Sequence, residues 1–170
     1  MGFCCCACEI CEGIDSPTAT LTIQNYDDVD PPGDCDYAGF NGNYSLAIYP
    51  SELMYQQFYF LGFNTYIQQK DCQIGFTGDF IVEWCGPPFG AAGLSIRVFI
   101  SYDIETNTTH VWALLHQVDY RIFDHLYYGT ATGQIDCTNA TINLTTELFK
   151  TFYADETWDD SVLRIILSFP

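Results

Sequence analysis

Cysteines near the N-terminus are the feature of this sequence most suited to chemistry. Cys5, Cys8 and Cys11 are spaced three residues apart, and a tight turn places side chains at this spacing on one side. Thiolates that converge in this way bind soft ions such as zinc or the iron of an iron–sulfur cluster. The fourth ligand of a tetrahedral site would be one of three further cysteines: Cys4, Cys6 or the distant Cys35. We weigh this metal site, with Cys4 beside the three, against disulfides or contacts between subunits and against an arm with free thiols.

Clustered carboxylates form a second candidate site. Asp27, Asp28, Asp30 and Asp34 lie close together in an acidic loop, and hard cations such as Ca²⁺ bind such carboxylates. The loop does not match the spacing of an EF-hand, because the required glycine and terminal glutamate are absent. The alternative is a solvated loop, which is the commoner role of an acidic run. We expect that the protein requires no cofactor, with zinc or an iron–sulfur cluster at the cysteines and Ca²⁺ at the acidic loop as the alternatives.

The histidines do not form a recognisable catalytic motif. On a strand, His110 and His116 share a face with Trp112 and Leu114, so we interpret them as hydrogen-bonded packing residues rather than ligands. The sequence contains neither a Gly-x-Ser-x-Gly elbow nor a His-Glu-x-x-His helix. We therefore expect a protein that is not an enzyme.

Four more cysteines are spread over the rest of the chain, at positions 35, 72, 85 and 137. They could form two disulfides, or they could be reduced residues of the core. We favour reduced thiols, because the N-terminus lacks the basic and apolar segments of a secretory signal. The longest uncharged stretch, Leu53–Gln69, carries several amide side chains and is too polar to span a bilayer.

Composition excludes two broad classes of protein. The chain has 170 residues with 22 acidic and five basic side chains, which gives a formal net charge of −17. It also contains 13 Phe, 12 Tyr and 3 Trp, which is far too many for an intrinsically disordered chain. No basic stripe is present to neutralise phosphates, so a nucleic-acid partner is not expected.

Period-two alternation of apolar and polar residues is the main signal for the fold. In residues 95–102, Ile96, Val98 and Ile100 alternate with polar side chains, which is typical of a sheet with one packed face. The other alternating segments are residues 20–25, 43–49, 79–84, 141–148 and 163–169. Helical periodicity occurs only at Leu53–Phe60 and Thr146–Tyr153, and Asn41-Gly42 is a strong hairpin dipeptide.

These patterns predict two regions. Residues 1–17 form a cysteine-rich N-terminal arm without regular structure. Residues 18–170 form one all-β domain, an antiparallel β-sandwich with a jelly-roll-like topology.

The domain resembles the small all-β structural proteins of tailed bacteriophages, such as capsid cement proteins and tail or baseplate proteins. The likeness is one of overall character across residues 18–170, and the segment Phe40-Asn41-Gly42-Asn43-Tyr44-Ser45-Leu46 is its most suggestive stretch. The resemblance implies a non-enzymatic virion component that contacts copies of itself and a capsid or tail protein. It also implies assembly in the host cytoplasm and release by lysis, without a signal peptide or a membrane anchor.

A module that binds carbohydrate or a receptor is the alternative. It would use exposed aromatic rings as stacking platforms, for which Trp158 and Tyr127 are the candidates. In that case the acidic loop would hold Ca²⁺.

Overall fold

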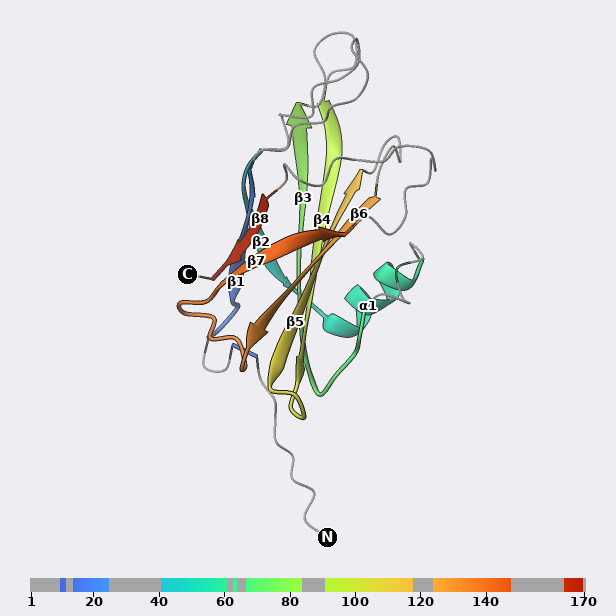
Figure 1. Ribbon diagram of the computed structural model, residues 1–170. Coiled ribbons are helices and arrows are strands. Elements are labelled where there is room, and N and C mark those ends of the chain that lie inside the picture. Colours follow the sequence, from blue (N-terminus) through green and yellow to red (C-terminus); the bar gives the residue numbers. More distant parts are fainter. Residues whose placement is uncertain are drawn as a thin grey trace.

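Eight strands and one helix make up the part of the chain that the structure describes, which comprises residues 10–11, 14–24, 41–60, 63, 67–83, 91–117, 124–147 and 164–169. Figure 1 shows this computed structural model. The elements are β1 (Thr18–Gln24), β2 (Gly42–Tyr49), α1 (Ser51–Phe60), β3 (Cys72–Glu83), β4 (Ala91–Asp103), β5 (Thr108–Gln117), β6 (Asp124–Thr132), β7 (Thr141–Glu147) and β8 (Arg164–Ser168). Among the described residues, no helix is long and apolar enough to cross a membrane.

The strands form a closed antiparallel sheet in sequence order. Each strand pairs with the next one along the chain, and β8 returns to pair with β1. The prediction of an all-β, antiparallel fold is therefore confirmed. The strand order differs from the expected jelly roll, in which consecutive strands cross between two sheets. Tight connections such as the turn between β4 and β5 instead keep sequence neighbours side by side.

The closed sheet has two four-stranded halves. Between β2 and β3 only Ala47–Tyr49 and Gly75–Thr77 are paired, and between β6 and β7 only Leu126–Tyr128 and Thr145–Glu147. One half is therefore β3–β4–β5–β6, with long ladders, and the other is β7–β8–β1–β2. The inward-facing side chains of both halves belong to a single apolar core.

The inner face of both halves is apolar. Ile96, Val98 and Ile100 have no exposed surface, which confirms the alternation predicted for β4. Leu21 of β1 and Leu167 of β8 are equally buried on the opposite side of the same core. The barrel interior is therefore filled by side chains.

Helix α1 covers part of the outer face of the long half, where its backbone lies closest to β3 and β4 (Figure 1). Met54 and Phe58 are one helical turn apart and fully buried. They pack in a second apolar cluster on four outward-facing side chains of the sheet: Phe99, Trp112, Leu114 and Leu126. The helical periodicity of Leu53–Phe60 is thus confirmed. For Thr146–Tyr153, the first two residues belong to β7 and the rest lie outside the described residues.

A glycine allows the chain before α1 to lie close to the sheet. A Cβ atom at Gly75 would lie 2.8 Å from the carbonyl oxygen of Tyr49 and 3.2 Å from the Cβ of Met54. The first distance is shorter than real Cβ contacts. Position 75 therefore needs glycine for α1 to rest on β3.

Candidate functional site

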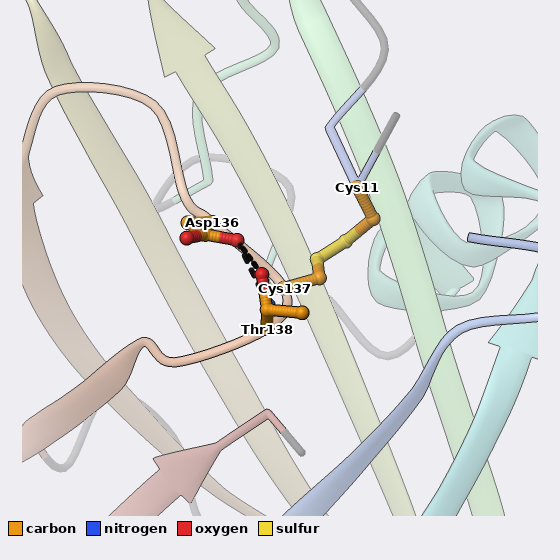
Figure 2. The surroundings of a disulfide bond; sticks show 4 residues. All are labelled: Cys11, Asp136, Cys137 and Thr138. Atoms are coloured by element: carbon orange, nitrogen blue, oxygen red, sulfur yellow. Dashed lines mark hydrogen bonds between the residues drawn. A yellow bond between two sulfur atoms is a disulfide. The ribbon is translucent and has the colours of Figure 1, made fainter. Parts of the chain in front are cut away.

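The one arm cysteine that the structure describes is in a disulfide. Figure 2 shows Cys11 bonded to Cys137 in the connection between β6 and β7, with Cα atoms 4.9 Å apart. Both residues are buried with Ile10 and Ile135, and these four side chains join the core of the barrel. The bond spans 126 positions of the sequence, so it restricts the unfolded chain strongly and stabilises the fold by about 3–5 kcal/mol.

The disulfide changes the interpretation of the cysteine cluster. A sulfur that is bonded to another sulfur is not a thiolate ligand, so the predicted metal site is wrong for Cys11. Cys4, Cys5 and Cys8 lie outside the described residues. A disulfide therefore attaches Cys11 to the domain. The spacing of the arm cysteines alone did not distinguish a disulfide from a metal site.

Asp136 shapes the turn that presents Cys137. Its backbone oxygen accepts hydrogen bonds from the amides of Asn139 and Ala140, at 3.4 and 3.1 Å. Its carboxylate accepts two more from the hydroxyl and the amide of Thr138, as Figure 2 shows. These bonds from Thr138 lower the pKa of Asp136, against a smaller opposing effect of burial.

Cys72 is also disulfide-bonded. All cysteines in the described residues are therefore oxidised, and the prediction of reduced core thiols is wrong for Cys72 and Cys137. The sequence argument relied on the missing secretory signal, whereas the pairing depends on which side chains the fold brings together.

Tyr127 is not a stacking platform. Its side chain has no exposed surface, because it points into the barrel from β6, so that prediction is wrong. The other proposed platform, Trp158, lies outside the described residues, as do the candidate calcium ligands Asp27, Asp28, Asp30 and Asp34. Among the described residues, no group of three or more His, Cys, Asp or Glu side chains is placed to hold a metal.

A row of polar residues crosses the outer face of the long half beyond the part that α1 covers. Ser95 on β4 lies opposite Asp79 on β3 and opposite His116 on β5. These residues line a surface depression of about 470 Å³, together with Arg97 and Ile81. The Ser95 side chain is 1% exposed, and its Oγ has no hydrogen-bond partner among the residues described.

The order of this row excludes one catalytic arrangement. In a Ser–His–Asp triad the histidine lies between the other two and takes the serine proton. Here Ser95 is in the middle, and Asp79 and His116 are two strands apart, which is roughly 10 Å. Asp79 therefore cannot orient the imidazole of His116. The row is therefore not a catalytic triad of this kind.

A second polar group lies nearer the β4–β5 turn and has a packing role. The rings of His110, Trp112 and Tyr128 contact one another, with the His110 centroid 5.7 Å from Trp112 and 5.9 Å from Tyr128, and the Nδ1 of His110 is 2.5 Å from the hydroxyl oxygen of Tyr128. Burial lowers the pKa of His110, and the charge of Lys70 lowers it further against the opposing charge of Asp103. This confirms the interpretation of His110 as a hydrogen-bonded packing residue.

Asp103 fixes the start of the turn between β4 and β5. Its carboxylate accepts hydrogen bonds from the amides of Glu105 and Thr106 and pairs with Lys70 at 3.4 Å. Burial alone would raise the pKa of Asp103, but these bonds outweigh it and lower the pKa. The charges of Asp103 and Lys70 therefore stabilise the hairpin of β4 and β5.

Among the described residues, the upper part of β3 has one edge on which no strand is paired. Gly78–Glu83 pairs with β4 on one side, whereas pairing with β2 on the other side ends at Thr77. Figure 1 shows the β3–β4 hairpin extending beyond the other strands. On this segment Ile81 is 84% exposed, more than any other large apolar side chain in the described part of the chain.

Sequence reasoning did not bring the polar row together. The alternation in residues 95–102 places Ser95 and Arg97 on the polar face, but nothing in the sequence gives the register that adds Asp79 and His116. Comparisons of the chain with family models, with curated proteins and with solved structures find no match.

Proposed function

We propose that this protein is a non-enzymatic structural subunit that acts by docking on another protein, as a decorating or tail component of a phage virion does. The observation that carries the proposal is the edge of β3 at Gly78–Glu83, which pairs with no strand in the described part of the chain. An unpaired edge presents a row of backbone N–H and C=O groups, and an extended segment of a partner can add to it as a further strand.

The side chains on this edge favour such docking. Natural proteins usually protect an open edge with charged side chains, most often lysine, or with proline or a bulge. Here the segment contains neither lysine nor proline, its charged residues are Asp79 and Glu83, and Ile81 is 84% exposed. Burying an isoleucine of this exposure contributes about 2 kcal/mol to an interface.

The net charge indicates which partner would bind first. Free copies of a chain with a formal charge of −17 repel one another in solution, so self-association at this edge is disfavoured. A capsid or tail protein with a less acidic surface does not meet this barrier. We therefore assign the open edge to a partner protein and expect contacts between copies only in the finished assembly.

The disulfides support a role outside a reducing compartment. Cys11, Cys72 and Cys137 are all oxidised, and such bonds persist in the oxidising surroundings that a virion meets after release. The Cys11–Cys137 bond would also keep the N-terminal arm attached to the domain under those conditions.

Co-sedimentation with purified phage capsids and tails tests the proposal. We expect the protein to sediment with one of these particles, and the variant Ile81→Lys to bind about tenfold or more weakly. The control is Ile104→Lys, which changes a 51% exposed isoleucine in the β4–β5 turn. A protein that stays monomeric by light scattering with every particle would overturn the proposal.

A further inference from the structure

We propose that the depression formed by β3, β4 and β5 on the outer face of the barrel binds a neutral, hydroxyl-rich ligand of the saccharide class. Its volume of about 470 Å³ lies within the usual range of small-molecule clefts, about 300–1,000 Å³. Its outward-facing lining comes from three adjacent strands: Asp79, Ile81, Gly93, Ser95, Arg97 and His116. This site does not depend on the docking role of the β3 edge.

Ser95 is the group that points to a ligand. Its side chain is 1% exposed, and its hydroxyl has no hydrogen-bond partner among the described residues. A buried hydroxyl without a partner is costly, and native structures usually supply one. A ligand hydroxyl in the depression can both donate to Ser95 Oγ and accept from it, which removes this cost.

The charges of the lining favour a neutral ligand. Asp79 only accepts hydrogen bonds, whereas Arg97 only donates them; Asp79 lies opposite Ser95 on β3, and Arg97 lies two residues from Ser95 along β4. An anion would meet Asp79 and the net charge of −17, while a cation would meet Arg97. Hydroxyl groups satisfy both side chains without adding charge. A guanidinium has five N–H donors, so Arg97 can serve the ligand in addition to its interactions within the protein.

The shape of the lining suits a sugar ring. Gly93 has no side chain and leaves the backbone of β4 accessible in the depression. Ile81, directly opposite Gly93 on β3, adds an exposed apolar surface. A saccharide ring has hydroxyls at its edge and C–H groups on its faces, so it matches a site with convergent polar groups and an apolar wall.

Calorimetric titration of the full-length protein tests this inference. The probes are neutral sugars (glucose, galactose, mannose and N-acetylglucosamine), the anionic sialic acid and the zwitterion glycine. We expect at least one neutral sugar to bind with a Kd in the millimolar range or tighter, and to bind more tightly than sialic acid and glycine. Binding of none of the neutral sugars, or a preference for a charged probe, overturns the inference.

Two variants locate the binding. Ser95→Ala should weaken the best sugar about 3–10-fold and Asp79→Asn about 10-fold or more, because the second change removes a charged acceptor. The control is Ser45→Ala, which removes an exposed hydroxyl from β2 in the other half of the barrel and should leave affinity unchanged. Unchanged affinity in both Ser95→Ala and Asp79→Asn overturns the site.

The same variants separate this inference from the docking proposal. Ser95→Ala leaves the backbone edge of β3 intact, so it should lose sugar affinity while its co-sedimentation stays normal. Ser95→Ala should also melt no lower than the wild type, because the hydroxyl it removes has no partner. A lower melting temperature would show that Ser95 has a structural partner and would overturn the inference.

Discussion

The outer face of the long half of the barrel has two regions that differ in what covers them. Under α1, Phe99 and Trp112 face outward and are buried beneath Phe58. Farther along the same strands and on the same face, Ser95 and His116 line an open depression. The strands, the face and the sheet are shared, so the difference in side-chain chemistry follows the position of the helix. The region that the helix leaves uncovered is where this protein offers polar groups to another molecule.

The largest expected effect is the loss of the helix-covered region. Phe58→Ala removes a fully buried ring from between α1 and the sheet and should lower the free energy of unfolding by about 3–5 kcal/mol. Urea denaturation measures this change. Leu53→Ala, at a position of the same helix that is 46% exposed, should change it by less than about 0.5 kcal/mol. Equal losses of unfolding free energy in the two variants would contradict the burial of Phe58 between α1 and the sheet.

A smaller loss of stability is expected from a substitution that pushes the start of α1 away from the sheet. Gly75→Ala places a methyl group 2.8 Å from the carbonyl oxygen of Tyr49, so the segment before α1 must shift. Overpacking of this kind costs about 1–3 kcal/mol, measurable by thermal or urea unfolding. Unfolding that is unchanged by this substitution would show that α1 does not lie close to β3.

Two buried serines on β4, Ser95 and Ser101, allow a direct comparison, because both lie on the outer face of the same strand. The hydroxyl of Ser101 accepts a hydrogen bond from the amide of Lys70 at 2.8 Å, so Ser101→Ala should destabilise the protein by about 1 kcal/mol. Ser95 has no such partner, so Ser95→Ala should leave stability unchanged or raise it by up to about 1 kcal/mol. Thermal unfolding of both variants checks the sign. The same sign for both would remove the distinction between a satisfied and an unsatisfied hydroxyl.

The smallest expected effect is a pH dependence beside the covered region. Burial lowers the pKa of His110 in the folded state, so the unfolded chain binds this proton more readily. Stability from the neutral ring is present above the ordinary histidine pKa of about 6.5 and declines as the pH falls below it. His110→Gln should therefore flatten the fall in melting temperature between about pH 7 and pH 5. A steeper fall in this variant would contradict the assigned cause.

The sequence predicts the inner face of the barrel better than the outer one. Ile96, Val98 and Ile100 alternate with polar residues, and this pattern depends only on the geometry of one strand. By contrast, every residue from Val111 to Leu115 is buried, because α1 covers the outward-facing Trp112 and Leu114. Such a continuous apolar run indicates burial on both faces, but it does not identify the segment that covers the second face.

Contacts between distant segments could not be predicted. Cys11 meets Cys137 because the fold places Cys11 beside the connection between β6 and β7, and cysteine spacing alone does not specify connectivity. Tyr127 was expected at the surface, and the register of β6 turns it inward. Likewise Asp79 and Ser95 become neighbours through the pairing of β3 with β4, which the residue types do not encode locally.

Residue-resolved amide hydrogen exchange of β3 is the most direct test of the docking edge. Backbone N–H groups of a strand point alternately to its two neighbours, so a strand that is paired on one side leaves every second amide open. In the isolated protein, the amides of Gly75–Thr77 should all be protected, while every second amide of Gly78–Glu83 should exchange rapidly and become protected on the particle. Slow exchange at every amide of Gly78–Glu83 in the isolated protein would mean that the chain already covers its own edge, which would contradict the account.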